Sequence, residues 1–379
     1  MPDQVPRTMA GALRWRDELA RGSRASERDM AEVSQVANMW DESGQPSLLF
    51  RNEPWCNGAV WSLNPNPYLP GTETNSSSNA ATIHWNNATQ QALYGAGAKG
   101  RLGGEYLDSL EGYVTADLNF RREHFRYTTV PLTFSREGND PALFKGFSVF
   151  EFTKWFCDQI HRLGRLTFAN GVPYRFTYLC PWLDVLGTET DWVRNGRYVP
   201  VSGEQMNLWR TMSGAKPYLL LMNTDYDVFT PEMVERYFQR SLFYGMFPGM
   251  FSHNAADNPY WQNPKWYNRD RPLFKKYLPL IKRVAEAGWQ AVTYGECDNP
   301  NIFIERFGPD RTGTLFFTLF NDRDTRQRGT LRIDSSSAGL IDPVTALEMI
   351  SNGPIENIGS WNVQLEPQES KVVEVRRAH

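Results

Sequence analysis

The sequence lacks the patterns that mark metalloproteins, disulfide-stabilised proteins and membrane proteins. Its five histidines form no HExxH or HxH cluster, so we expect no metal site. No CxxC pair occurs, and we expect buried free thiols in place of a disulfide framework. No run of about 18 apolar residues is present, so no transmembrane helix is predicted. The four cysteines are Cys56, Cys157, Cys180 and Cys297.

An excess of charge of one sign is also missing. The chain carries 40 Lys and Arg residues against 43 Asp and Glu residues, without the basic excess typical of nucleic-acid-binding proteins. No GxxxxGKS or GxxxxGKT loop occurs. The GxGxxG match at Gly95, Gly97 and Gly100 lacks the flanking strand and helix that nucleotide binding requires. We therefore expect no nucleic-acid partner, no membrane partner and no cofactor.

The start of the chain shows no apolar segment of the kind found in secretory signals. The sequence leaves the cellular compartment and the oligomeric state open. Aromatic residues, by contrast, are abundant: 13 Trp, 16 Tyr and 22 Phe make up 13% of the chain. Some of them must fill the core, and a surplus also suits a cleft that stacks on the flat apolar faces of sugar rings.

Apolar strands alternate with amphipathic helices between residues 46 and 298. Helical stretches end at Gly164 and Gly288, and another begins with Thr230 as N-cap and Pro231 at its first position. This alternation predicts a parallel α/β sheet, and we expect a (β/α)8 TIM barrel with its site at the carboxyl ends of the strands. Residues 1–45 read as an N-terminal helical segment. Short alternating strands over 299–379 predict an antiparallel β-sandwich domain.

The strand count is short of a closed barrel. Six or seven convincing strands lie between Ser47 and Glu296, whereas a closed barrel needs eight. We therefore expect a barrel that is incomplete or irregular at its N-terminal side, in a chain that lacks the beginning of its parent architecture.

Acidic residues follow several of the predicted strands. Because a carboxylate at the end of a buried strand costs desolvation free energy unless it is paired or used, several converging acids indicate a site. Glycoside hydrolysis needs two such carboxylates and no metal. The acids concerned are Glu53, Asp108, Glu111, Asp184, Glu189, Asp225 and Asp227.

The segment YLDSLEG and the closing stretch NVQLEPQESKVVEV carry a family resemblance. A barrel followed by a C-terminal β domain resembles retaining TIM-barrel glycoside hydrolases, with the layout of α-galactosidases and endo-α-N-acetylgalactosaminidases. Over residues 46–379 these short motifs support the superfamily and not one family. The resemblance implies a retaining glycosidase whose nucleophile is Asp108.

From the strand-end pattern, Glu189 is the predicted acid/base, with Asp184 and Asp225 as alternative catalytic acids. Each acid also has a structural interpretation, as a helix cap or as the partner of an arginine. The predicted substrate-binding residues are the remaining polar and aromatic groups at strand ends and in the neighbouring loops: Glu53, Trp55, Glu111, Asn170, Trp192, His253, Asn254, Asp257 and Trp261. Two alternatives stay open: a non-catalytic, degenerate carbohydrate-binding barrel, and a transglycosidase that uses the same acids.

Overall fold

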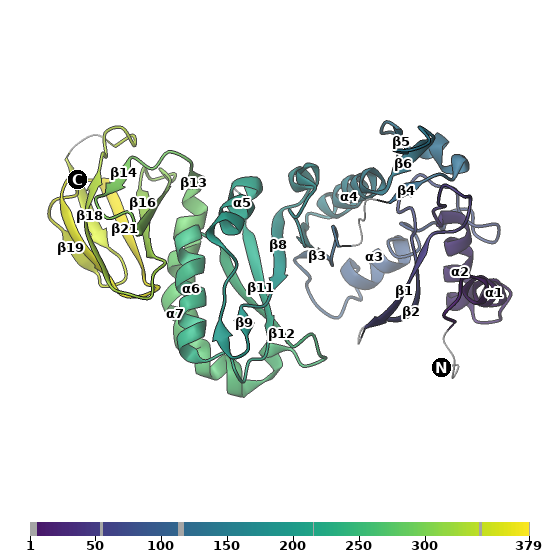
Figure 1. Cartoon of the computed structure of the whole chain (residues 1–379), viewed down its shortest axis with the longest axis horizontal. Helices are drawn as coiled ribbons and strands as arrows, with labels where there is room; N and C mark the ends of the chain where they lie inside the picture. Colours follow the sequence, from purple (N-terminus) through teal and green to yellow (C-terminus); the bar gives the residue numbers. More distant parts are fainter. Residues whose placement is uncertain (1–5, 54–55, 113–116, 215, 341–342, 379) are drawn as a thin grey trace. The chain divides into compact units, whose positions relative to one another are not determined.

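The computed structural model describes residues 6–53, 56–112, 117–214, 216–340 and 343–378 (Figure 1). The chain divides into two compact units, Met1–Leu183 and Asp184–His379. We describe each unit by itself. The predicted limits at residues 45 and 298 stay predictions.

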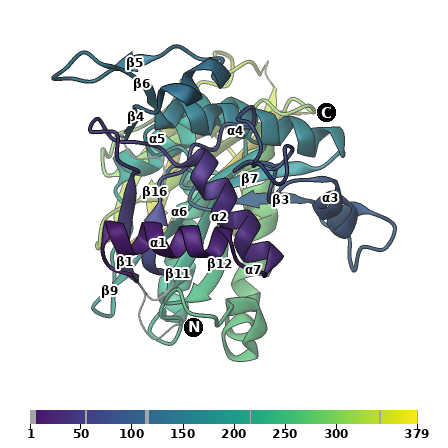
Figure 2. The same cartoon turned by 90° about the vertical axis from the view of Figure 1, so that its right-hand side faces the viewer.

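The first unit begins with two helices and a β-hairpin. Helices α1 (Met9–Ala20) and α2 (Ala25–Ala37), purple in Figure 2, are joined by a hydrogen bond from Gln35 Nε2 to Asp17 Oδ1 of 3.0 Å. Strands β1 (Leu48–Glu53) and β2 (Cys56–Trp61) pair antiparallel from Leu48↔Trp61 to Glu53↔Cys56. The strand predicted at Ser47 is therefore one arm of a hairpin and not the first strand of a barrel.

A parallel strand pair forms the part of this unit that positions the site. Strand β3 (Gly104–Leu107) pairs parallel with β7 (Leu166–Asn170), and helix α4 (Lys145–Arg162) precedes β7 in the chain. Gly164, at φ +65°, ends the helical stretch as predicted, because a left-handed residue is readily supplied by glycine. The other elements are α3 (Asn87–Tyr94), η1 (Arg122–Tyr127), η2 (Thr177–Trp182) and a small antiparallel sheet of β4 (Leu118–Asn119), β6 (Pro141–Phe144) and β5 (Thr133–Phe134).

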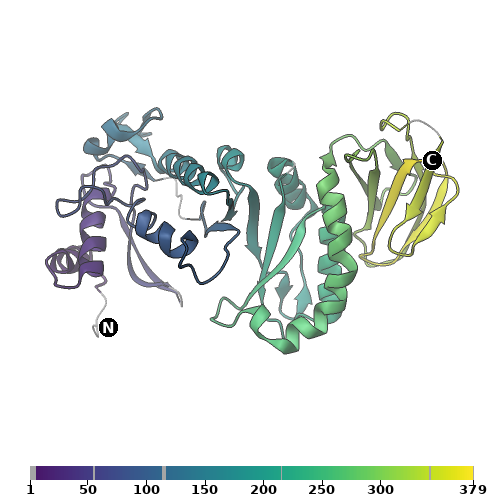
Figure 3. The ribbon, with the colours of Figure 1, turned by 180° about the vertical axis from the view of Figure 1, so that it is seen from behind.

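The second unit contains three parallel strands. Strand β11 (Tyr218–Thr224) lies between β8 (Val185–Thr190) and β12 (Phe247–His253). Helices α5 (Gly203–Ser213), α6 (Pro231–Tyr244) and α7 (Pro264–Ala287) accompany them, and Figure 3 shows the green helix α7 running along these strands. A short hairpin of β9 (Val193–Arg194) and β10 (Arg197–Tyr198) follows β8.

The predicted start of α6 is confirmed. The Thr230 side chain accepts a hydrogen bond from the Met233 N–H at 3.4 Å, and Pro231 occupies the first turn, where its missing N–H costs nothing. The predicted end of α7 is confirmed as well, because Gly288 is its C-cap residue at φ +83°.

An antiparallel β-sandwich completes the second unit. A six-stranded sheet and a three-stranded sheet contribute to one apolar core, in which Phe317 and Val373 of the larger sheet share a cluster with Leu331 and Val363 of the smaller one. The larger sheet has the order β13 (Trp289–Gln290), β15 (Ile302–Phe307), β16 (Leu315–Asn321), β21 (Ser370–Arg377), β18 (Val344–Glu348) and β19 (Gly353–Ile355). The smaller has the order β14 (Gly295–Cys297), β17 (Gln327–Ile333) and β20 (Trp361–Leu365).

Two strand predictions need correction. The stretch 289–296 does not extend the parallel strands, because β13 and β14 pair antiparallel with β15 and β17. The apolar run 174–192 is not one strand, because the 3-10 helix η2, with Pro181 inside it, precedes β8. Within the described residues, two parallel strands lie in the first unit and three in the second, fewer than the eight of a closed barrel.

The helices in the described part of the chain include none that is long and apolar enough to cross a membrane.

Candidate functional site

In the first unit, the parallel pair brings Asp108 and Asn170 together. Asp108 directly follows β3, and Asn170 is the last residue of β7. The Asn170 amide Nδ2 donates to Asp108 Oδ1 at 2.9 Å, and the hydroxyls of Tyr106 and Ser109 lie 3.3 Å and 3.2 Å from the same oxygen. Asp108 is exposed whereas Asn170 is buried, so a buried amide orients a solvent-accessible carboxylate.

A cavity of about 390 Å³ lies beside Asp108 within the same unit. This volume falls in the range of roughly 300–1,000 Å³ that is usual for small-molecule sites. Part of its wall is formed by apolar side chains from the hairpin and from α4, and these include the indole of Trp61 at the end of β2. The Arg16 guanidinium lies 4.8 Å from the centroid of the Trp61 ring and helps to fix it.

The cavity wall also contains a short chain of polar groups. The Lys145 ammonium donates to the Ser62 hydroxyl at 2.9 Å, and Ser62 Oγ lies 3.4 Å from Asp117 Oδ2 as a donor. Lys145 is the first residue of α4, and its backbone N–H donates to the Asp117 carbonyl at 3.1 Å. Burial lowers the pKa of Lys145, while the negative charge of Asp117 acts in the opposite direction.

Two other residues of this unit that were predicted to bind substrate, Glu111 and Glu53, are not placed to do so. Glu111 is only 1% exposed, and its carboxylate accepts backbone N–H bonds from Tyr174, Arg175 and Phe176 at 2.8, 2.5 and 3.0 Å. It therefore anchors the loop after β7 and does not face a ligand. Glu53 is exposed at the tip of the β1–β2 hairpin, not at the end of a parallel strand. Trp55 lies outside the described residues.

In the second unit, Glu189 is held by the neighbouring strand. Asn223 Nδ2 donates to Glu189 Oε2 at 3.3 Å. The oxygen of the same amide accepts from the Ala255 N–H at 2.7 Å and from Ser252 Oγ at 3.2 Å. These two donors fix which end of the amide carries the oxygen, so the NH2 end is directed to Glu189. Asn223 lies where the β11–β12 register shifts, between Met222 and Thr224.

Asp225 and His253 lie at the carboxyl ends of β11 and β12. Asp225 Oδ1 accepts from the backbone N–H groups of Asp227 and Val228, at 2.9 and 3.4 Å, which is the Asx-turn role of a short acid. His253 Nδ1 accepts from the Tyr226 N–H at 3.3 Å, and the imidazole stacks on Trp266 with 5.2 Å between ring centroids. Both side chains have structural work in the loop after β11.

Asp227, an acid of the same loop, is held ionised. Hydrogen bonds from Lys265 Nζ at 2.7 Å and from the Trp266 indole N–H at 2.8 Å lower the pKa of Asp227. Asn254, Asp257 and Trp261 are exposed in the segment that follows β12.

The remaining two predicted residues are separated from this edge. Asp184 precedes β8, whereas Glu189 lies five residues further along it. At about 3.3 Å per residue the two acids are about 16 Å apart along the strand, so Asp184 lies at the opposite end of β8. Trp192 is fully buried, with its ring centroid 5.1 Å from that of Tyr237. Its ring is part of the core and offers no free face to a sugar.

Sequence reasoning missed the groups that line the cavity beside Asp108 and the amide that directs Glu189. Trp61, Ser62, Asp117 and Lys145 lie in segments that are not ends of parallel strands, so the strand-end pattern gave no signal for them. Asn223, in MNTDYD, stands at the end of an apolar strand and fits that pattern, but it is missed when only acidic residues are considered. In the described residues, no group of three or more His, Cys, Asp or Glu side chains is arranged to hold a metal ion.

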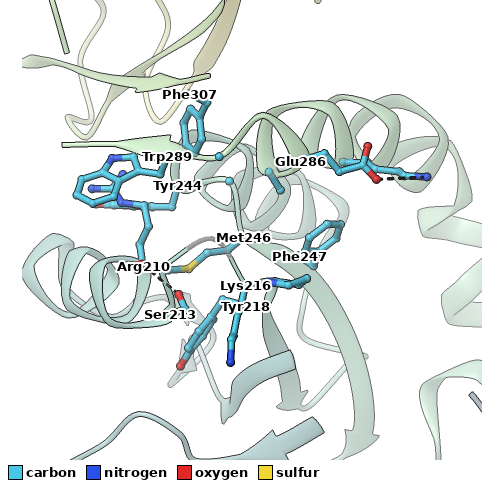
Figure 4. A pocket seen from close by; sticks show the side chains of 16 residues that line it. Arg210, Ser213, Lys216, Tyr218, Tyr244, Met246, Phe247, Glu286, Trp289 and Phe307 are labelled. Carbon is cyan, nitrogen blue, oxygen red and sulfur yellow. Dashed lines mark hydrogen bonds and ion pairs between the residues drawn. The ribbon is translucent and has the colours of Figure 1, made fainter. Parts of the chain in front are cut away.

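A second cavity, also of about 390 Å³, lies within the second unit at the amino ends of β11 and β12 (Figure 4). Arg210 lines it, 5% exposed, with its guanidinium 4.4 Å from the Trp289 ring centroid and 5.3 Å from that of Tyr244. Glu305 accepts from Arg210 Nη2 at 2.8 Å and from the Trp289 indole N–H at 2.7 Å. The arginine is thus held between rings at the strand ends opposite to Glu189.

No family model matches the chain, and no curated protein matches it. Several solved structures are similar to it. A family 27 β-L-arabinopyranosidase from Geobacillus stearothermophilus is 12% identical, with 60% of this chain and 77% of that chain covered and a TM-score of 0.27.

Two further structures extend this comparison. For α-galactosidase I from Mortierella vinacea the identity is 7%, the coverage 61% and 64%, and the TM-score 0.41. A family 30 endoxylanase from Clostridium papyrosolvens C71 is 13% identical, with 96% of this chain and 84% of that chain covered and a TM-score of 0.37. All three similar structures are of glycoside hydrolases.

Proposed function

We propose that the protein hydrolyses O-glycosidic bonds, with Asp108 as the nucleophile and Glu189 as the acid/base. The observation that carries the proposal is the setting of Asp108. Its carboxylate is exposed, is oriented by the Asn170 amide at 2.9 Å, and lines a cavity of small-molecule size with an indole in the wall. An accessible anion beside an apolar surface suits a reaction at a sugar carbon.

The proposed reaction has two steps. In the first, an Asp108 carboxylate oxygen attacks the anomeric carbon while protonated Glu189 gives its proton to the departing glycosidic oxygen. In the second, Glu189 removes a proton from a water molecule, and the water oxygen displaces Asp108 from the anomeric carbon. Asn223 fits this scheme as a positioning residue, because its directed NH2 group restricts the Glu189 carboxylate. Retention requires the two carboxyl groups to be about 5–5.5 Å apart during the reaction.

The test is turnover of a panel of aryl α- and β-glycosides by the wild type, Asp108→Asn and Glu189→Gln. We expect Asp108→Asn to lose turnover on every substrate that the wild type hydrolyses. We expect Glu189→Gln to lose about 10²–10⁴-fold on glycosides with poor leaving groups, and much less on dinitrophenyl glycosides, which need no protonation to leave. Asp158→Asn, an exposed carboxylate on α4, is the matched control.

Wild-type turnover by Asp108→Asn would contradict the assignment of the nucleophile. A loss in Glu189→Gln that is equal for good and poor leaving groups would contradict the acid/base role. If the wild type binds sugars and hydrolyses none of the panel, the non-catalytic alternative replaces the proposal.

A further inference from the structure

The polar part of the cavity beside Asp108 combines a donor and an acceptor of opposite charge. Lys145, Ser62 and Asp117 form one hydrogen-bonded chain, and all three residues line the cavity. An ammonium group has three N–H bonds. Within the described residues, one of them is given to Ser62 Oγ. As far as the described residues go, the other two can reach an acceptor in the cavity.

Lys145 is not at this position for the stability of the helix. It is the first residue of α4, where the helix dipole disfavours a cation. Its partial burial disfavours the charge as well, in agreement with the lowered pKa. A side chain that is unfavourable for its own helix and is aimed at a cavity is the pattern expected of a ligand-binding group.

We propose that Lys145 and Asp117 bind neighbouring hydroxyl groups of a neutral sugar ring in the cavity beside Asp108, with Ser62 holding the lysine in place. A sugar hydroxyl both donates and accepts, so one hydroxyl accepts from the ammonium while its neighbour donates to the carboxylate. Trp61 supplies an apolar wall for the face of the ring. The inference rests on the proposed function, because it takes this cavity as the site of the sugar whose anomeric carbon Asp108 attacks.

The charges around the cavity select a neutral sugar over a uronic acid. Two cations, Arg51 and Lys145, and two anions, Asp108 and Asp117, line it. A wall with two cations and two anions has no net charge that would attract a sugar carboxylate, whereas the hydroxyl groups of a neutral sugar satisfy both the donor Lys145 and the acceptor Asp117. Lys145 and Asp117 are therefore assigned as specificity-determining residues for hydroxyl groups.

The experiment is calorimetric titration of the full chain with methyl α- and β-hexopyranosides and the matching methyl hexuronides, whose methoxide leaves too poorly for rapid hydrolysis. The variants are Lys145→Met and Asp117→Asn. Lys154→Gln, an exposed lysine of the same helix outside the cavity, is the control. Because a hydrogen bond to a charged group is lost, we expect Lys145→Met and Asp117→Asn each to weaken binding of a neutral glycoside about tenfold or more.

A stability measurement separates binding from a structural role. The Lys145→Met substitution removes a partly buried charge from a helix N-terminus, which is favourable, and also removes the cation near Asp117, which is unfavourable. Because these two effects oppose each other, we expect the thermal midpoint of this variant to stay close to that of the wild type. We also expect the wild type to bind a neutral glycoside more tightly than the matching hexuronide.

Three results would overturn the inference: wild-type affinity in Lys145→Met, tighter binding of the hexuronide than of the neutral glycoside, or no binding of any methyl glycoside. Failure of the proposed function has a different signature. Turnover that persists in Asp108→Asn removes the nucleophile, while a loss of neutral-sugar affinity in Lys145→Met still supports the sugar site.

Discussion

His124 links the stability of the first unit to pH. The imidazole is 3% exposed, and both of its nitrogens are used. The amides of Asn119 and Asn64 donate to Nδ1 at 2.9 and 3.3 Å, and Nε2 donates to the Val36 carbonyl at 2.9 Å. This is the pattern of a neutral ring with its proton on Nε2. A proton on Nδ1 would face two NH2 groups and has no acceptor among them.

The magnitude follows from the pKa. Burial lowers the pKa of His124 from 6.5 to about 4. The hydrogen bond to the Val36 carbonyl acts in the opposite direction and raises this pKa, whereas the nearby positive charge of Arg121 lowers it further. Between these two values the unfolded chain binds a proton that the folded chain does not bind, so the free energy of unfolding falls as the pH falls. At roughly 1.4 kcal/mol per tenfold change, the full loss is about 3 kcal/mol, of which about 2 kcal/mol is lost between pH 7 and pH 5.

The assay is urea unfolding of the wild type and of His124→Gln at pH 7 and pH 5, followed by tryptophan fluorescence. The variant is less stable at both pH values because it disturbs the buried amides, but its loss between them should be smaller by about 2 kcal/mol. His84→Gln, at an exposed position, should keep the wild-type dependence. Equal losses in the wild type and His124→Gln would refute the reasoning, since the carboxylates common to both would then account for the whole pH dependence.

Two further predictions concern side chains with structural roles. Glu111→Ala should lower the free energy of unfolding by about 3 kcal/mol, because three backbone N–H groups lose a buried carboxylate. As a control, the exposed Glu53→Ala should change the free energy of unfolding by less than about 0.5 kcal/mol. A cost below about 1 kcal/mol for Glu111→Ala would contradict its role as an anchor of the loop after β7. Trp192→Ala should lower the free energy of unfolding by about 3–5 kcal/mol, because it leaves a cavity among buried rings. Trp261→Ala, at a side chain 55% exposed, should be nearly neutral in the same urea titration. Similar effects of the two substitutions would show that Trp192 is not a core residue.

The sequence predicts best where local chemistry and apolar pattern agree. In α6, the Thr230 cap and Pro231 at the first turn are local signals, and the structure contains both. The strand β11 follows from the apolar run YLLLM, because a strand buried between two parallel neighbours needs apolar residues on both faces.

The prediction is wrong where the sequence of a strand does not say which strand is its partner. A short extended stretch such as 48–53 reads the same whether its partner is parallel or antiparallel, and here the partner is the antiparallel neighbour β2. Burial of an acid is equally invisible in the sequence. Glu111 and Asp108 stand three residues apart, yet one is closed in by backbone N–H groups and the other is open to solvent.

The two strand-end carboxylates share one means of orientation. Asn170, at the end of β7, reaches Asp108 after the paired strand β3, and Asn223, at the end of β11, reaches Glu189 on the paired strand β8. In a parallel pair the carboxyl ends meet at one edge, so a short amide on one strand spans to the acid on the next. An amide restricts the carboxylate without bringing a full positive charge to it. Asp227, which is paired with Lys265, is held differently. In the proposed reaction Asp108 forms a bond to carbon and Glu189 gives up and regains a proton, and a neutral amide can orient either carboxylate while adding no full charge of its own.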